Sequence, residues 1–202
     1  SDELANLKAR QGVAFIVADT GLRGVDSEMN DVKRDGSQMG EVVMRGNNVM
    51  SGYFSDEAAT ATAFEGGWFH SGDLAVWHSD GYIELQDRAK DIIISGGENI
   101  SSQEVEKVIM EHEGVLEVSV VGVPDVRWGE VPKAFVMARD GSEVSESELI
   151  QFTRDRIAHF KAPKYVEFGE LPKTATGKIQ KYVLREKEWE GQEKRIQGST
   201  LI

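Results

Sequence analysis

The chain has 202 residues, 40% of them hydrophobic, which is enough for one large or two small globular domains. It contains no cysteine and only four histidines, with no close pair at metal-ligand spacing, so we expect no metal site built from protein ligands. The net charge of −12 disfavours non-specific nucleic-acid binding. A polyanionic ligand would need a local concentration of Lys and Arg, and residues 161–187 supply one.

The sequence also bears on membrane insertion and cellular targeting. No apolar run reaches the roughly 18 residues of a membrane span, and the first residues lack the pattern of a signal peptide. The final Ser-Thr-Leu-Ile is not a peroxisomal address of the Ser-Lys-Leu type. We therefore expect a soluble intracellular protein, in the cytoplasm rather than the peroxisome.

The first part of the chain, to about residue 86, reads as short strands separated by turns. The expected strands are 13–18, 40–45, 68–77 and 82–85, with turns at 21–24 and 79–81. Ser55 is expected to cap an Ala-rich helix that stops at Gly66 and Gly67. These elements predict a β-rich subdomain, either a distorted barrel or a sheet.

The second part alternates helices and strands. Ser101 with Glu104, and Ser145 with Glu148, have the spacing of capping boxes at the starts of two helices. The expected strands are 116–123, 131–138 and 164–168. The predicted fold class is therefore α+β, with a small C-terminal domain in which helices cover a three-stranded sheet.

Several residues in turns have side chains that suit ligand binding. Lys178 lies at the tip of a Gly-containing loop before an amphipathic run, where lysine can act as a point charge on a phosphate or carboxylate. Thr-Gly-Lys alone also describes many solvated turns. Asp73 follows a Ser-Gly turn, where its carboxylate can accept hydrogen bonds from a ribose diol or cap its own backbone.

A glycine pair and a tryptophan are further candidates. Gly96 and Gly97 follow the apolar run 92–94, and they permit positive φ or the close passage of another chain. The plain alternative is a glycine turn before a helix. Trp128 can stack on a nucleotide base or pack against the protein.

Three segments, 68–74, 87–100 and 171–181, resemble in order and spacing the C-terminal part of the AMP-forming acyl-CoA synthetases, members of the adenylate-forming superfamily. The resemblance covers nearly the whole chain. The phosphate loop, the adenine and Mg²⁺ segment and the acyl pocket, which such enzymes carry further N-terminal, do not occur here. The implied domains are 1–86, the tail of the large AMP-binding domain; 87–90, a hinge linker; and 91–202, the C-terminal lid domain.

The resemblance also implies roles near the hinge. Asp73 binds the ribose hydroxyls of ATP and Arg88 joins it, whereas the alternative for Arg88 is a surface ion pair with Asp87 or Asp91. Lys90 occupies the hinge position, and the alternative is an ordinary exposed linker lysine.

For coenzyme A, the resemblance implies that Gly96 and Gly97 flank the pantetheine arm and that Trp128 stacks on the adenine. Lys161 and Lys164 are candidates to meet the CoA phosphates, with an exposed basic edge as the alternative.

Lys178 is the implied catalytic residue. Acid and ATP are both anionic, so bringing a carboxylate onto the α-phosphorus needs a positive charge there, besides Mg²⁺ held by the phosphates. The implied reaction converts acid and ATP to acyl-adenylate, and then CoA gives the thioester and AMP.

Short- or medium-chain fatty acids and aromatic acids are the expected substrates, and the chain alone is expected to be inactive. The alternatives are a non-catalytic CoA- or partner-binding module, and the adenylation domain of another adenylate-forming enzyme.

Overall fold

The computed structural model describes residues 10, 12 and 21–192. The chain divides into two compact units between Lys90 and Asp91. The strand predicted at 13–18, and the residues from 193 onward, lie outside the described residues. No helix in the described part of the chain is long and apolar enough to cross a membrane.

The first unit contains an antiparallel sheet with strand order β1-β2-β3-β4. Its strands are β1 (Leu22–Val25), β2 (Met39–Met44), β3 (Phe69–Trp77) and β4 (Ile83–Arg88). The predicted strand at 40–45 and the hairpin of 68–77 with 82–85 are thereby confirmed. The turn predicted at 21–24 is wrong, because these residues pair with β2 as a strand.

This first sheet is open in the part that the structure describes, since its outer strands β1 and β4 do not pair with each other. The predicted alternative of a sheet therefore applies, without barrel closure. Its core consists of Val42, Ala75, Trp77 and Ile83. In β2 the adjacent residues Val42 and Val43 are both buried, so both faces of the sheet are covered at this point.

Helix α2 (Glu57–Ala63) starts one residue later than predicted. Its N-cap is Asp56, whose carboxylate accepts the Ala59 N–H at 2.9 Å. Ser55 cannot be that cap, because its φ of 54° belongs to the turn before the helix. The helix ends at Ala63, before the predicted stop at Gly66 and Gly67. The 3₁₀ turn η2 (Glu65–Gly67) follows, where Gly66 has a positive φ.

The second unit is an α+β domain with a five-stranded sheet. Its strands are β5 (Ile93–Ser95), β6 (Glu98–Ile100), β7 (Val115–Asp125), β8 (Gly129–Ala138) and β9 (Tyr165–Phe168). The three predicted strands are confirmed as β7, β8 and β9, and the short β5–β6 hairpin adds two. Strands β7 and β8 form a long antiparallel hairpin, and β9 runs parallel to β8.

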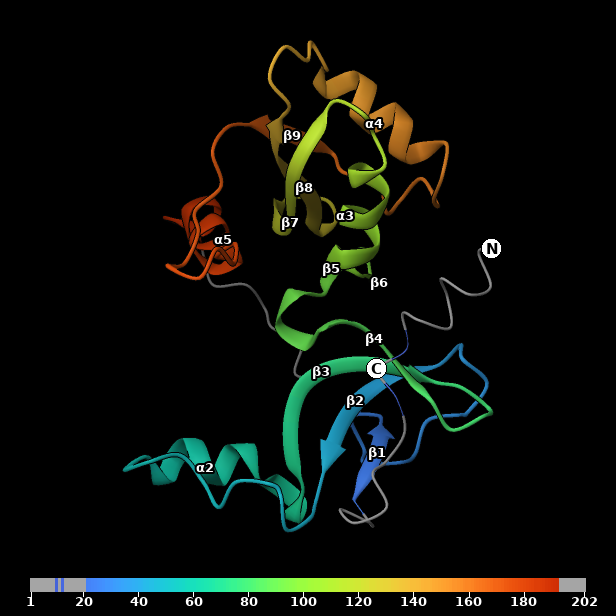
Figure 1. The fold of residues 1–202 in the computed structure, drawn as a ribbon, viewed down its shortest axis with the longest axis vertical. Helices are drawn as coiled ribbons and strands as arrows, with labels where there is room; N and C mark the ends of the chain where they lie inside the picture. Colours follow the sequence, from blue (N-terminus) through green and yellow to red (C-terminus); the bar gives the residue numbers. More distant parts are fainter. Residues whose placement is uncertain (1–9, 11, 13–20, 193–202) are drawn as a thin grey trace. The chain divides into compact units, whose positions relative to one another are not determined.

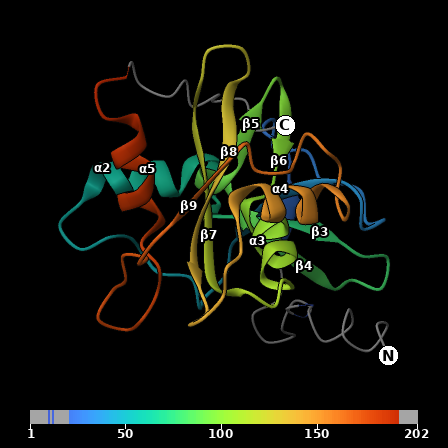
Figure 2. The same cartoon turned by 90° about the horizontal axis from the view of Figure 1, so that it is seen from above.

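Helices cover both faces of this second sheet (Figures 1 and 2). Helices α3 (Ser102–Met110) and α4 (Glu146–Arg154) pack on one face, and α5 (Lys181–Trp189) lies on the other. The core on the α3–α4 side includes Ile93, Ile100, Val105, Ile109, Val120 and Leu149. A smaller cluster on the α5 side includes Val121, Val131, Phe135, Leu171 and Leu184.

The two predicted capping boxes differ in detail. At α4, Ser145 and Glu148 cap each other's backbone N–H groups, so that box is complete. At α3, Ser101 accepts the Glu104 N–H at 3.2 Å, but the Glu104 carboxylate binds the Lys161 ammonium. The carboxylate that the local sequence assigns to the cap therefore pairs with a lysine that is distant in the sequence.

Candidate functional site

The Ser-Gly-Asp motif forms a bulge in β3. Its neighbour β2 passes from Glu41 to Val43 while β3 passes from Leu74 to His70, so three residues of β3 lie opposite one. The Glu41 carboxylate holds the bulge by accepting the Gly72 N–H at 2.9 Å, and its other oxygen lies 2.7 Å from His70 Nδ1. Gly72 has a φ of 70°, which favours glycine at this position.

Asp73 leaves this bulge directly opposite Arg88 of β4. Arg88 Nε lies 3.0 Å from Asp73 Oδ1, and the two side chains are 55% and 29% exposed. The hairpin thus brings together the two residues expected at the ribose. Both remain accessible enough to contact a ligand.

The alternative interpretations of these two residues predicted other partners. The Asp73 carboxylate pairs with the Arg88 guanidinium across the hairpin, whereas an Asx turn would have used its own backbone. For Arg88, the alternative of a surface ion pair with Asp87 or Asp91 is wrong, because its guanidinium pairs with Asp73. Asp87 is buried and accepts the Arg88 backbone N–H at 2.8 Å, and Asp91 binds the Arg185 guanidinium.

Lys90 is exposed and lies in the 3₁₀ turn η3 (Ala89–Asp91), which directly follows β4. The boundary between the two compact units falls immediately after it. A residue at such a boundary can change its backbone torsions without disturbing either sheet. This position fits the expected hinge, whose movement stays a prediction.

Gly96 and Gly97 form the two-residue turn of the β5–β6 hairpin. Their φ angles are 60° and 90°, and a type I′ turn needs positive φ at both central residues. The Trp128 carbonyl accepts the Gly96 N–H at 2.8 Å. A Cβ on Gly96 would lie only 2.7 Å from Cε3 of the Trp128 ring, whereas a Cβ on Gly97 would meet open space.

This contact predicts unequal effects of alanine at the two glycines. Both changes place a side chain at positive φ, at a cost of about 1–2 kcal/mol. Only Gly96→Ala also pushes against the Trp128 ring, which adds about 1–3 kcal/mol of overpacking. Urea denaturation of both variants of the chain, followed by circular dichroism, measures the difference. Equal losses would mean that the ring does not rest on Gly96.

Trp128 is 44% exposed and lies in the turn between β7 and β8. The Asp125 carboxylate accepts the backbone N–H groups of Arg127 at 2.9 Å and Trp128 at 3.0 Å, and it also binds the Lys164 ammonium. Hydrogen bonds from Lys164, and then from the two N–H groups, lower the pKa of Asp125 below its usual value. The turn is thus held in one shape.

Sequence reasoning did not identify Arg127 or Asp125 as candidate site residues. The Arg127 guanidinium lies 4.5 Å from the centroid of the Trp128 ring, at cation–π distance. The signal that could have revealed Asp125 is its position two and three residues before the amides that it accepts, as in an Asx turn. The local sequence does not indicate that Lys164 pairs with Asp125, because strand β9 brings Lys164 beside Asp125 only in the folded unit.

The basic segment 161–187 is mostly neutralised by carboxylates in the folded unit. Most of its cations form ion pairs, with Glu104, Asp125, Glu117, Glu106, Asp91 and Glu167. The paired cations are Lys161, Lys164, Lys173, Lys181, Arg185 and Lys187. The expected local excess of positive charge is therefore much reduced.

Lys178 is the one cation of this segment without an ion pair among the residues that the structure describes. Its backbone is held in a tight turn, since its carbonyl accepts the Thr174 N–H at 2.8 Å and its N–H donates to Thr174 Oγ1 at 3.1 Å. Gly177, with a φ of 85°, completes the turn. The exposed ammonium is available to an anion. Within the described residues no group of three His, Asp or Glu side chains could hold a metal ion.

Comparison with known proteins identifies the second unit. Residues 104–178 match the family described as the AMP-binding enzyme C-terminal domain. Over these residues the chain is similar to that C-terminal domain. The match begins in α3 and ends at Lys178, so it includes Trp128 and the turn that carries the free ammonium.

Curated relatives of the chain are CoA ligases. An acetate–CoA ligase of Humulus lupulus is 56% identical over 91% of this chain and 33% of its own length. A 4-hydroxybutyrate–CoA ligase of Metallosphaera sedula is 52% identical over the same shares. The chain therefore spans about a third of the length of these relatives and corresponds to their C-terminal portion.

Solved structures of adenylate-forming enzymes share the fold. ATP-bound MatB from Rhodopseudomonas palustris aligns with a TM-score of 0.80 and 32% identity, over 91% of this chain and 36% of that one. MenE, the o-succinylbenzoate CoA synthetase from Bacillus subtilis in complex with its acyl-adenylate intermediate, aligns with a TM-score of 0.79 and 32% identity, over 91% and 37%. The α+β fold class is confirmed.

Proposed function

We propose that the chain is the C-terminal part of an ATP-dependent acid–CoA ligase, which forms an acyl-adenylate and then an acyl-CoA thioester. The observation that carries the proposal is Lys178, an exposed cation on a hydrogen-bonded glycine turn. Among the described residues it has no carboxylate partner, whereas the other cations of its segment are paired. Two anionic reactants need such a charge between them. The relatives, named as acetate, 4-hydroxybutyrate and trans-cinnamate ligases, support a short- or medium-chain fatty acid or an aromatic acid.

Asp73 and Arg88 are proposed to hold the ATP ribose. A carboxylate can accept hydrogen bonds from both hydroxyls of a vicinal diol. The bulge in β3 and the register of β4 support this role, because they hold both side chains in place before a ligand arrives. Arg88 orients the carboxylate through its guanidinium.

The coenzyme A site is proposed at Gly96, Gly97 and Trp128. Open space above Gly97 leaves room for an extended pantetheine arm beside the turn. The exposed Trp128 ring offers a stacking surface for adenine, and Arg127 brings a positive charge beside it. Mg²⁺ is proposed to be bound by the ATP phosphates, where it would neutralise their charge.

Lys90 is proposed as the hinge at which the domain 91–202 turns relative to 1–86, with 87–90 as the linker. In one orientation the lid would present Lys178 to ATP and acid, and in the other it would present the Gly96–Gly97 turn. The unit boundary after Lys90 supports this placement. Residues 87 and 88 belong to β4, so the freedom to turn concentrates in η3.

The isolated chain is expected to form no acyl-adenylate, because the residues that hold the triphosphate and the acid lie elsewhere in the proposed enzyme and positioning supplies much of the rate. The test incubates the chain with ATP, Mg²⁺ and a panel of short, medium and aromatic acids and measures pyrophosphate. The control is the Lys178→Ala chain. Pyrophosphate release above that control would contradict the expectation.

A second candidate is a different acyl acceptor. The solved structures include an amide bond synthetase, McbA from Marinactinospora thermotolerans, at a TM-score of 0.78 and 34% identity. Full-length protein given ATP, acid and either CoA or an amine separates these functions by its product. The third possibility, a binding module without chemistry, predicts CoA binding by calorimetry and no AMP.

The cellular compartment is proposed to be the cytoplasm. The trans-cinnamate relative of Petunia hybrida is named peroxisomal, so the peroxisome is the competing candidate. Microscopy of the full-length protein with a fluorescent N-terminal tag would locate it. Punctate signal overlapping a peroxisomal marker would contradict the cytoplasmic proposal.

A further inference from the structure

Helix α5 begins three residues after Lys178 and carries two inward-facing cations. Lys181 and Arg185 are four residues apart, so they lie on the same face of the helix. Lys181 Nζ lies 2.6 Å from Ser102 Oγ and 2.8 Å from Glu106 Oε1. The Arg185 guanidinium binds the Asp91 carboxylate. We call these two ion pairs, Lys181–Glu106 and Arg185–Asp91, the α5 clamp.

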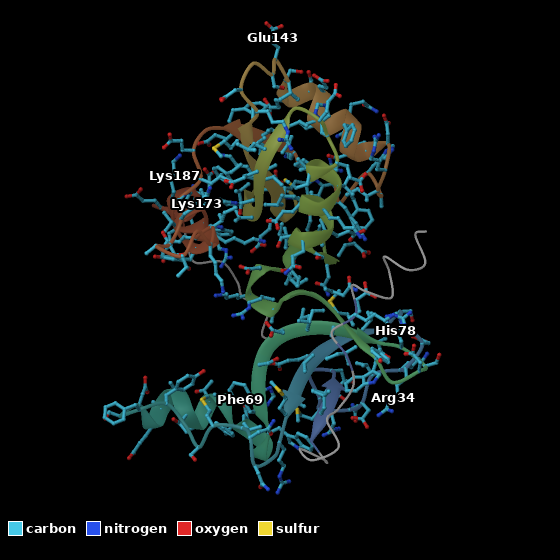
Figure 3. The ribbon with its side chains drawn as sticks, in the orientation of Figure 1. Arg34, Phe69, His78, Glu143, Lys173 and Lys187 are labelled. Carbon is cyan, nitrogen blue, oxygen red and sulfur yellow. The ribbon has the colours of Figure 1, made fainter. Side chains whose placement is uncertain are left out.

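The clamp is shielded from water. Lys181 and Glu106 are each 19% exposed, and Arg185 and Asp91 are 17% and 11% exposed. Removing one partner of such a pair leaves a poorly solvated charge behind and is more costly than at the surface. Lys187 offers the contrast on the same helix, because it is 62% exposed in its pair with Glu167 (Figure 3). Exposed pairs of this kind contribute little.

Apolar packing alone holds α5 only weakly. Leu184 is the one buried residue of the helix. The Trp189 indole adds one hydrogen bond to the Gly122 carbonyl at 3.0 Å. A helix held by one buried side chain can roll or slide on the sheet, and any such movement would displace the Lys178 turn that precedes it. The Lys133–Glu188 ion pair, 2.7 Å long and 13% and 20% exposed, fixes the C-terminal end of the helix. The clamp constrains the N-terminal half, which follows the Lys178 turn.

The two carboxylates of the clamp connect α5 to two different parts of the unit. Asp91 directly follows Lys90, the proposed hinge residue. Glu106 also accepts the Val120 N–H at 2.7 Å, so it ties Lys181 to strand β7. The clamp therefore connects the helix after Lys178 both to the first residue beyond the hinge and to the central sheet.

We propose that the α5 clamp makes Asp91, Arg185 and Lys181 positioning residues for Lys178, an inference that rests on the proposed adenylation function. When the lid turns at Lys90, the Arg185–Asp91 pair carries the Lys178 turn with the backbone that moves. The clamp thus holds the ammonium at one distance from the pivot. It acts in acyl-adenylate formation, and the Gly96–Gly97 turn does not depend on it.

The test compares Arg185→Ala with Lys187→Ala in the full-length protein. Adenylation is followed by pyrophosphate release, and the second step by thioester formation from supplied acyl-adenylate and CoA. Arg185→Ala is expected to lower kcat for adenylation about 10-fold or more, with the KM for ATP near wild type, since a displaced catalytic group loses rate rather than ground-state binding. Thioester formation should stay within about twofold. Lys187→Ala should match wild type in both.

A conservative variant distinguishes the positioning of Lys178 from general damage to the fold. Arg185→Lys keeps the charge and should restore most of the adenylation rate, while Asp91→Asn should repeat the loss seen in Arg185→Ala. Equal losses in both half-reactions for the two clamp variants, or no loss in either, would overturn the proposal. Melting temperatures of all variants identify any that fail to fold, and Asp91→Asn then replaces Arg185→Ala.

Hydrogen exchange tests the clamp without turnover. Arg185→Ala is expected to speed amide exchange across 181–189 relative to Lys187→Ala, and unchanged exchange would refute the clamp. Should the wild-type protein release no pyrophosphate with any acid, the proposed function fails. The exchange measurement still decides whether α5 is held by these pairs.

Discussion

Replacing Lys178 by alanine in the full-length protein is expected to slow acyl-adenylate formation by about 10²-fold or more, the scale of losing one preorganised electrostatic group. The ammonium has no carboxylate partner in the described part of the chain, so its removal leaves no buried charge and little structural damage. The turn keeps its backbone hydrogen bonds to Thr174. Pyrophosphate release under single-turnover conditions measures the effect.

Thioester formation should suffer much less from Lys178→Ala, because only the first step brings two anions together. Supplying synthetic acyl-adenylate and CoA isolates the second step. Lys173→Ala is a matched control in the same hairpin, since Lys173 pairs with Glu117 on the α5 side of the unit (Figure 3). Equal losses in both half-reactions, or an equal effect of Lys173→Ala, would contradict the assigned role.

Replacing Lys90 by proline is expected to separate the two half-reactions completely. Proline fixes φ near −65° and biases Ala89 towards extended geometry, so η3 loses the torsional freedom that a hinge needs. We expect the adenylation-competent orientation to be trapped. The variant would then release pyrophosphate while losing thioester formation from supplied adenylate.

Lys90→Ala is the control for the hinge, because it removes the side chain and leaves the backbone free. It should behave like wild type in both half-reactions. The opposite trap would reverse the pattern of losses, and misfolding would abolish both while lowering the melting temperature. Near wild-type rates in both steps of the proline variant would show that Lys90 is an exposed linker lysine and that the lid turns elsewhere.

Local signals predicted most elements of the second unit. Strands β7, β8 and β9 appear where apolar runs and turn residues place them. For β7 and β8 the reason is that a strand buried on both sides needs a continuous apolar segment. The cap of α4 needs only residues three apart. The β5–β6 hairpin was harder to predict because each strand has three residues, and a two-residue glycine turn was the only local sign.

In the candidate site, too, some features follow from local motifs and others depend on the tertiary structure. The positions of Asp73, Lys178 and the Gly96–Gly97 turn follow from local motifs, since each depends on a glycine that permits positive φ nearby. The pairing of Asp73 with Arg88 requires the register of β3 against β4, which shifts at one bulge between Leu74 and Ala75. A register shift of one residue would turn either side chain to the other face of the sheet.

The fold class, the order of the motifs and the presence of a lysine on the glycine turn at 178 follow from residue type and spacing along the chain. The ion pairs that leave Lys178 as the unpaired cation of its segment, among the described residues, depend on tertiary structure. Lys161 pairs with Glu104, Lys164 with Asp125 and Arg185 with Asp91, across separations that local patterns do not span. Ion pairs form between side chains that folding brings within a few ångströms. The basic stretch 161–187 therefore becomes, in the described part of the second unit, a largely neutralised surface on which Lys178 has no ion pair.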